Sequence, residues 1–154
     1  MQPIIKTTNV FYNKSNAVKP VSNPKVAIIV PSKSNNNIDK SKRILDLFQV
    51  DYSDIKPIEN KNNLYNSIIF AKNDGYSAIL CYDNDLDVID DIAKHTVLPI
   101  VYIGSAKIHN SSNCNPIAIF NDYSAINATI FLIQILSIKY SYIQKKLEDM
   151  QNSI

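Results

Sequence analysis

The sequence is short of glycine, since its 154 residues contain only two, Gly75 and Gly104. Loops that wrap a phosphate with backbone N–H groups usually need glycine for close approach and for positive φ. Two isolated glycines cannot form a glycine-rich phosphate loop of any type. This scarcity excludes the common loop-based nucleotide sites.

Cysteine and histidine are equally scarce, at two residues each. Cys81 and Cys114 are far apart and lack metal-ligand spacing, so neither a disulfide framework nor a zinc site is indicated. Cys81 falls in a predicted core strand, where cysteine behaves as a small buried hydrophobe. Only His95 and His109 could supply an imidazole, and we expect His95 at a helix C-terminus and His109 in an exposed loop.

An excess of one charge and a long apolar segment are also missing. The net charge is +2 with both signs mixed, which gives no electrostatic case for nucleic acid or an anionic membrane. The longest apolar run, residues 130–138, is interrupted by Gln134 and Ser137 and is too short to span a bilayer. The first residues lack the continuous apolar segment of a secretory signal. We therefore predict a cytoplasmic protein that binds neither nucleic acid nor membranes.

The chain is organised around residues 25–37, KVAIIVPSKSNNN. Residues 26–30 form a short apolar run, typical of a strand buried on both faces of a parallel sheet. Pro31 ends the strand because proline has no N–H to donate. A polar turn leads to a helix that starts near Asn37. A strand, a polar turn and a helix N-terminus form the usual anion-binding corner of an α/β domain.

The rest of the chain alternates between strand and helix patterns. Residues 1–24 are polar and proline-containing, and we expect an extended or disordered arm with one short edge strand near residues 10–12. Further strands are predicted at 50–58, 78–82, 99–103 and 117–120, and helices at 62–74, 86–95 and 122–151. This alternation predicts one α/β domain, residues 25–154, with a parallel sheet between helices.

The last predicted helix is the longest and carries an apolar stripe. Heptad spacing relates seven of its residues, and Thr129 is the weak position in the series. These are Ile126, Ile133, Leu136, Tyr140, Ile143, Leu147 and Met150. From Tyr140 onward the helix outruns the core of a small domain. We therefore expect this end of the stripe to pack against another subunit.

An acidic turn follows the third predicted strand, with aspartates at 83, 85, 87, 90 and 91. Asp83, Asp85 and Asp87 are the only candidates for ligating Mg²⁺ or Ca²⁺, or for forming a receiver-like acidic pocket. The spacing lacks the glycine and final glutamate of an EF-hand. We favour a solvated loop with an acidic helix N-terminus as the explanation of the cluster. We predict neither a bound metal nor a cofactor.

Three segments of the chain together resemble one enzyme family. IIVPSKSN at residues 28–35 resembles a strand-end motif IIMGSKSD. TVLPIVYIGSA at 96–106 resembles TTLPVIGVPV, and SAINATIFLIQIL at 124–136 resembles GAANAALLAAQIL. The family is the carboxyaminoimidazole ribonucleotide mutases (PurE, or AIR carboxylase) of purine biosynthesis. The resemblance implies a flavodoxin-like three-layer αβα sandwich and a homo-oligomer, usually an octamer, joined through C-terminal helices.

The resemblance also implies a ligand site. Family enzymes move a carboxyl group from an exocyclic nitrogen to C4 of an aminoimidazole ring, with the nucleotide phosphate on a serine loop. Ser32 and Ser34 match the serines of that loop, and Asn35 stands where the family has aspartate. The family's SAHR segment falls on PIENK at 57–61, where Lys61 replaces the charge of the arginine without its bidentate fork.

Other matched positions have lost the family's chemical groups. A glycine-rich turn becomes CYDNDLDVID at 81–90, which places acidic residues where a phosphate would approach. Neither histidine matches a family histidine, and a mutase needs a group that exchanges protons near neutral pH. We predict a degenerate PurE-like pseudoenzyme without catalytic residues, an oligomeric structural or ligand-binding protein whose candidate ligand is nucleotide-like. Two alternatives stay open, an active mutase with rearranged residues and a receiver-like regulatory module.

Overall fold

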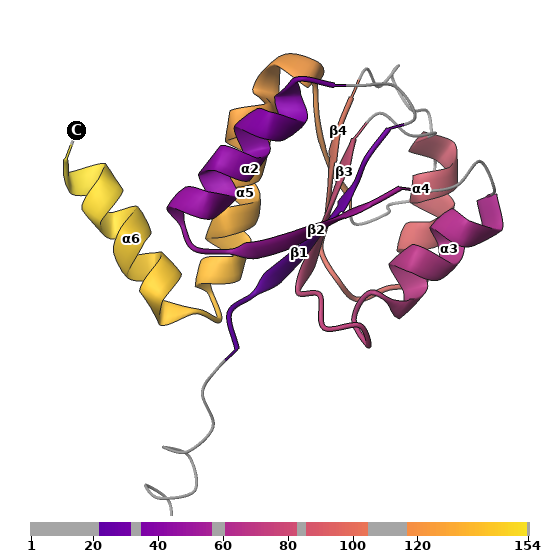
Figure 1. Ribbon diagram of the computed structural model, residues 1–154, viewed down its shortest axis with the longest axis horizontal. Helices are drawn as coiled ribbons and strands as arrows, with labels where there is room; N and C mark the ends of the chain where they lie inside the picture. Colours follow the sequence, from indigo (N-terminus) through magenta and orange to yellow (C-terminus); the bar gives the residue numbers. More distant parts are fainter. Residues whose placement is uncertain (1–21, 32–34, 57–60, 83–85, 105–116, 154) are drawn as a thin grey trace, which may run out of the picture.

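A computed structural model describes residues 22–31, 35–56, 61–82, 86–104 and 117–153. Most of the predicted arm, including the edge strand expected near residues 10–12, lies outside these ranges. Figure 1 shows a sheet in the centre with helices on both sides. No helix in the described ranges combines the length and apolar character needed to cross a membrane.

Five parallel strands form the sheet, in the order β2-β1-β3-β4-β5. They are β1 (Lys25–Ile29), β2 (Asp51–Ile55), β3 (Ala78–Tyr82), β4 (Ile100–Ile103) and β5 (Ile117–Phe120). This order belongs to the flavodoxin-like doubly wound sheet, in which the chain reverses direction across the sheet between β1 and β3.

The helices form the two outer layers. They are α2 (Asn37–Leu47), α3 (Lys61–Phe70), α4 (Leu86–Ala93), α5 (Ala125–Ser137) and α6 (Ser141–Asn152), with a short 3-10 helix η1 (Asp122–Ser124). Side chains alternate along each strand, so Val26 and Ile28 face α2, α5 and α6, while Ala27 and Ile29 face α3 and α4. The predicted three-layer αβα sandwich with a parallel sheet is confirmed.

The single long helix predicted at residues 122–151 is wrong. The chain leaves α5 through a turn at Ile138 and Lys139, and Tyr140 has an extended backbone with φ −112° and ψ 101°. The break redirects α6 so that it folds back beside α2 and α5 (Figure 1). Ile143 and Leu147, 0% and 7% exposed, then join the core of the same chain.

The apolar stripe therefore needs no second subunit at its C-terminal end. Ile143 and Leu147 pack in one cluster with Phe48 and Val50, which connect α2 to β2. The Tyr142 hydroxyl donates a hydrogen bond of 2.9 Å to the Gln49 carbonyl oxygen. The argument for an oligomer from an uncovered C-terminal stripe is overturned, because α6 is covered by its own domain.

The predicted apolar stripe also differs from the buried face of α5. Ile126 is 45% exposed, whereas Thr129 is 0% exposed and faces the core. The Thr129 hydroxyl is 2.7 Å from the Ala125 carbonyl oxygen of the preceding turn, and this contact makes its burial possible. Thr129, the weak position of the heptad pattern, is therefore buried together with Ile133 and Leu136 of the stripe.

Several predicted boundaries shift inward. The second strand ends at Ile55, the helix of residues 86–95 ends at Ala93, and the helix of 62–74 ends at Phe70. Turns follow Phe70 up to Gly75, whose φ of 90° is the left-handed value that makes glycine suitable there. Cys81 is fully buried, as predicted.

Candidate functional site

Doubly wound folds bind ligands beyond the carboxyl ends of the strands, where the strand order reverses. In this chain that point lies between the carboxyl ends of β1 and β3. We call the side of the sheet at which the strands end the carboxyl edge, and the side at which they begin the amino edge. Of the predicted ligand-binding residues, the described part holds Asn35 in full. Lys61 begins α3, but its side chain lies outside the described part, as do Ser32 and Ser34 entirely.

At this carboxyl edge, asparagine side chains hold the start of α2 in place. The Asn35 Oδ1 accepts a hydrogen bond of 2.9 Å from the backbone N–H of Asn37. The Asn37 side chain donates one of 2.9 Å to the carbonyl oxygen of Asp122 in η1. These side chains tie the turn after β1 to the turn after β5, so they have internal structural partners.

Asn121 caps the start of η1, which follows β5 at the same carboxyl edge. Its Oδ1 accepts hydrogen bonds from the Tyr123 backbone N–H at 3.1 Å and from the Ser124 hydroxyl at 3.0 Å. Such caps satisfy N–H groups that have no partner inside the helix. The side-chain oxygen of Asn121 is thus used in ending β5 and starting the next helix.

The side chain at the end of β3 is Tyr82, which is fully buried. Its hydroxyl is hydrogen-bonded to the Ser41 hydroxyl and donates to the Asn37 carbonyl oxygen at 3.2 Å. The Thr129 Oγ1 lies 2.6 Å from the Ser41 Oγ and 2.7 Å from the Ala125 carbonyl oxygen. We call Ser41, Tyr82 and Thr129 the hydroxyl network. It joins β3, α2 and α5 inside the protein.

Burial raises the pKa of the Tyr82 phenol to about 12, although its hydrogen bond with Ser41 acts in the opposite direction. The phenol is therefore protonated throughout the physiological range. A proton-transfer catalyst needs a pKa near the working pH. The hydroxyl network consequently has a structural role.

His95 lies at the opposite, amino edge of the sheet, between the end of α4 and the start of β4. Its backbone N–H donates to the Ile92 carbonyl oxygen at 2.9 Å, and its ring meets Tyr65 edge-on with 5.8 Å between centroids. The predicted place at a helix C-terminus is close to what is found. His109 lies outside the described residues.

The acidic turn is described only in part. Asp83 and Asp85 lie outside the described residues, and Asp87 is exposed in the first turn of α4. Within the described ranges, no group of three or more histidine, cysteine, aspartate or glutamate side chains is placed to hold a metal ion.

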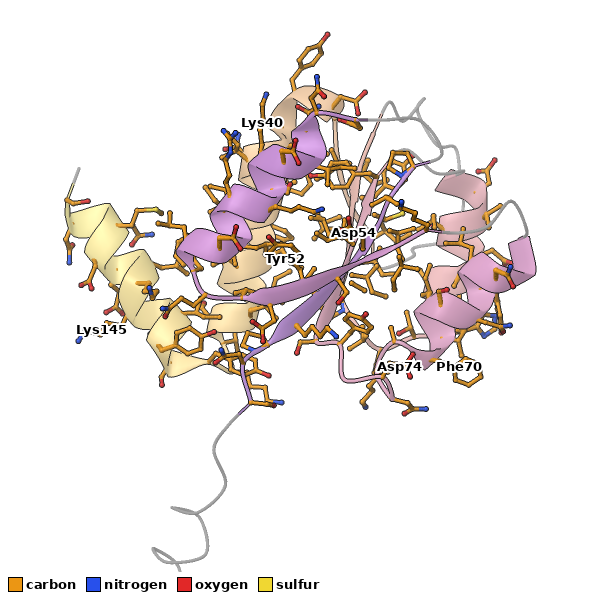
Figure 2. The ribbon with its side chains drawn as sticks, viewed as in Figure 1. Lys40, Tyr52, Asp54, Phe70, Asp74 and Lys145 are labelled. Carbon is orange, nitrogen blue, oxygen red and sulfur yellow. The ribbon has the colours of Figure 1, made fainter. Side chains whose placement is uncertain are left out.

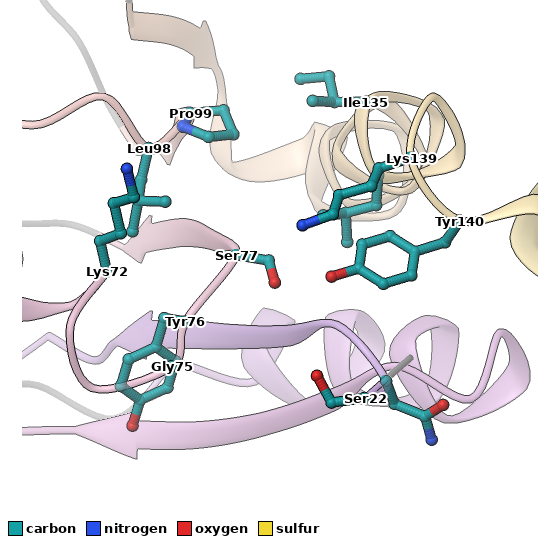
Figure 3. Close-up of a pocket in the computed structure, with 12 residues that line it drawn as sticks. Ser22, Lys72, Gly75, Tyr76, Ser77, Leu98, Pro99, Ile135, Lys139 and Tyr140 are labelled. Carbon is teal, nitrogen blue, oxygen red and sulfur yellow. The ribbon is translucent and has the colours of Figure 1, made fainter. Parts of the chain in front are cut away.

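A cavity of about 420 Å³ opens at the amino edge of the sheet. Its walls come from the turn between α3 and β3, the entry to β4, the start of β1 and the junction of α5 with α6 (Figure 3). The polar lining residues are Ser22, Asn23, Lys72, Tyr76, Ser77, Lys139 and Tyr140. Sequence reasoning missed all of them, because a continuous last helix leaves no junction there.

Comparison with known proteins assigns no family to the chain: no protein-family model and no curated protein matches it. Among solved structures, it is similar to a provisionally named lipoprotein fragment from Peptoclostridium difficile 630. That match has a TM-score of 0.54 and 15% identity, and covers 75% of this chain and 99% of the other. At this identity the match supports the fold alone.

Two further solved structures match with lower TM-scores. A 3-dehydroquinate dehydratase-like protein from Bifidobacterium longum gives 0.44 at 12% identity, covering 71% of this chain and 98% of that one. The Francisella novicida lysine decarboxylase LdcF gives 0.49 at 13% identity, covering 79% of this chain and 18% of the enzyme. Neither score supports an argument about function, and the PurE resemblance stays a prediction.

Proposed function

We propose that this chain is a PurE-like protein that has lost mutase catalysis and binds a small molecule as part of a homo-oligomer. The observation that carries the proposal is the hydroxyl network at the end of β3. In an α/β enzyme this is where reactive groups are usually presented. Here Tyr82 points inward, is fully buried and is hydrogen-bonded to Ser41 of α2.

The amide side chains and the phenol described at the carboxyl edge are also unsuited to proton transfer. The side chains of Asn35, Asn37 and Asn121 are amides, which do not titrate near neutral pH. The pKa of Tyr82 is raised to about 12. His95, the histidine in the described ranges, lies at the amino edge. A carboxyl transfer that depends on proton exchange has no support from these groups.

The proposed self-association uses the edge of the sheet at β5. An edge strand leaves backbone groups unpaired, and apolar residues exposed beside it favour a partner. Ile119 of β5 is 46% exposed, and Ile126 and Phe131 of α5 are 45% and 38% exposed. The Phe131 ring lies against Phe120 of β5, with 5.7 Å between centroids. An octamer is implied only by the family resemblance, and a cytoplasmic location stays a prediction.

Catalysis is tested by incubating purified protein with carboxyaminoimidazole ribonucleotide and following its interconversion with the N5-carboxy isomer. We expect no turnover above the uncatalysed rate, while a known PurE enzyme serves as the positive control. Turnover would overturn the proposal and would make His109→Asn the first variant to test. A thermal shift with the same nucleotide, repeated on Asn35→Ala, checks the predicted corner of Ser32, Ser34 and Asn35.

Self-association is tested separately by light scattering on the eluting protein. We expect a multiple of the chain mass of 17.4 kDa. Phe131→Glu should reduce it, because a charge would be buried in the contact. Lys145→Glu on α6 is a matched control that should leave the mass unchanged. A wild-type protein that elutes at the mass of one chain would rule out the assembly.

A further inference from the structure

We propose that the cavity at the amino edge binds a small organic anion with an apolar group, an inference that rests on the proposed binding function and gives it a site. The cavity volume of about 420 Å³ falls within the ligand-pocket range of roughly 300–1,000 Å³. Its apolar wall consists of Leu98, Pro99, Ile135 and Leu136.

Two lysines give the cavity its charge. Lys72 lines it from the turn after α3, and Lys139 lines it from the α5–α6 junction. Ion pairs in the described ranges join Lys42 to Asp54 and Lys94 to Asp91, and neither Lys72 nor Lys139 takes part in one.

Acidic residues are missing from the described lining of this cavity. Asp74 precedes Gly75 in the same turn, but its side chain is exposed and lies outside the lining. The positive charge of the two lysines is therefore uncompensated at the cavity wall, and a concave wall of one charge sign attracts the opposite ion.

Tyr140 provides the second, independent observation. The residue is only 7% exposed and its ring belongs to the core cluster. Its hydroxyl nevertheless makes no hydrogen bond within the part of the chain that the structure describes. Figure 3 shows this hydroxyl and the Lys139 ammonium both extending from the α5–α6 junction toward Ser77. This hydroxyl is not among the buried polar atoms that lack a partner, so it is open to the cavity, where an acceptor group of a ligand can replace water.

The Lys139 ammonium and the Tyr140 hydroxyl lie on the same wall of the cavity. The Lys139 ammonium lies 5.5 Å from the centroid of the Tyr140 ring. The same extended backbone at Tyr140 that separates α5 from α6 directs the ring to this position. An ammonium, the phenol and the Ser77 hydroxyl can all donate hydrogen bonds to one acceptor group. A carboxylate or a phosphate satisfies them, and the apolar wall accommodates the rest of the molecule.

Binding is tested by isothermal titration of the full chain with phenyl phosphate and with benzoate. Benzyl alcohol has the same ring without charge, and inorganic phosphate has the charge without a ring. We expect saturable binding of one or both organic anions and weaker binding of both controls. The stronger of phenyl phosphate and benzoate identifies the anionic group. Absence of saturable binding, or equal binding of benzyl alcohol, would overturn the assignment.

Three variants test whether the ligand binds in this cavity. Lys139→Gln removes a charge-assisted donor and should weaken binding about tenfold, and Tyr140→Phe, which keeps the ring, should weaken it roughly threefold. Lys145→Gln is the matched control, since Figure 2 shows Lys145 on the outer side of α6, and it should bind as wild type. Unchanged affinity in both cavity variants would overturn the site. Thermal unfolding of each sample confirms that the variants are folded.

The two proposals fail separately. Turnover of the ribonucleotide would remove the claim of lost catalysis and leave anion binding at the amino edge intact. Failure of all organic anions to bind would remove the cavity as a site and leave the absence of turnover standing.

Discussion

The carboxyl and amino edges of the sheet differ in whether their polar side chains have hydrogen-bond partners within the described part of the chain. At the carboxyl edge the hydroxyls of Ser41, Tyr82 and Thr129 are fully buried and bonded to one another. At the amino edge the Tyr140 hydroxyl and the Lys139 ammonium border a cavity and have no hydrogen-bond or ion-pair partner in the described part of the chain.

Fold alone therefore does not locate a function. The strand order points to the carboxyl edge, as it does in other doubly wound sheets. The side chains point to the amino edge. Polar groups that are hydrogen-bonded to one another inside the protein stabilise the fold, while polar groups that border a cavity without such a partner are available to bind a ligand. Removing groups from one edge at a time tests this contrast.

The largest effect is expected from truncating the chain after Ser137. This removes Tyr140, Ile143 and Leu147, which are 7%, 0% and 7% exposed. Burying one large apolar side chain contributes about 1.5–3 kcal/mol, so the loss is about 5 kcal/mol or more, comparable to the whole stability of a small domain. Circular dichroism should show a largely unfolded chain. A folded truncated protein that merely dissociates would restore the interpretation of α6 as an intersubunit element.

The next effect concerns alkaline pH. The pKa of Tyr82 is about 12 in the folded chain against the ordinary tyrosine value of 10.0. The unfolded chain therefore binds fewer protons between these values, and the free energy of unfolding falls as pH rises from 10 toward 12. The loss is roughly 2 kcal/mol. Urea unfolding should show this fall in wild type and a smaller one in Tyr82→Phe.

The raised pKa values of Tyr52 and Tyr142 act in the same direction, since burial is their main cause. Both residues are present in wild type and in Tyr82→Phe, so their contributions cancel in the comparison. Equal slopes with pH in the two proteins would contradict the buried position of the Tyr82 hydroxyl.

Removing one hydroxyl from the network should have a smaller effect. Thr129→Val keeps the shape of the side chain but leaves the Ser41 hydroxyl with one partner fewer in a buried site. We expect a loss of about 1–2 kcal/mol in the free energy of unfolding, measured by urea at pH 7. A neutral result would mean that water reaches this edge, and the contrast between the edges would be lost.

The smallest effect on stability is expected at the amino edge. Tyr140→Phe also removes one hydroxyl, and Lys139→Gln one exposed charge. Each should change the free energy of unfolding by less than about 0.5 kcal/mol, because neither group has a hydrogen-bond or ion-pair partner to lose in the described part of the chain. Both are expected to weaken anion binding. A loss from Tyr140→Phe as large as that from Thr129→Val would show that the Tyr140 hydroxyl is structural.

Much of the fold follows from local pattern. The strands β1, β3, β4 and β5 each contain a short apolar run, whereas the edge strand β2, DYSDI, does not. The predicted limits of β3 and β5 agree with the structure. Gly75 occupies the left-handed turn expected of it. These features depend on neighbouring residues only, so one sequence is enough to predict them.

The break between α5 and α6 could not be read from periodicity. Tyr140 and Ile143 continue the heptad spacing across the break, and both are buried. The available signal was the pair of serines, Ser137 and Ser141, which flank the break at positions that favour helix ends. Packing of α6 against the α2–β2 corner is a long-range contact, which the local pattern does not encode.

The two edges also differ in how far the sequence predicts them. Asn35 could be predicted at the carboxyl edge because one continuous segment contains the strand, the turn and the helix start. The cavity joins segments around residues 22, 75, 98 and 139, which are distant in sequence. Its position depends on the change of chain direction at Tyr140, so local sequence patterns do not predict it.

The contrast between the edges is tested most directly by backbone amide chemical shifts during titration of the full chain with phenyl phosphate. We predict that the largest shifts fall at the amino edge, on Tyr76, Ser77, Lys139 and Tyr140, while the amides of Asn35 and Tyr123 stay in place. Shifts concentrated on Asn35 and Tyr123 would contradict this, and would return the ligand to the carboxyl edge of the sheet.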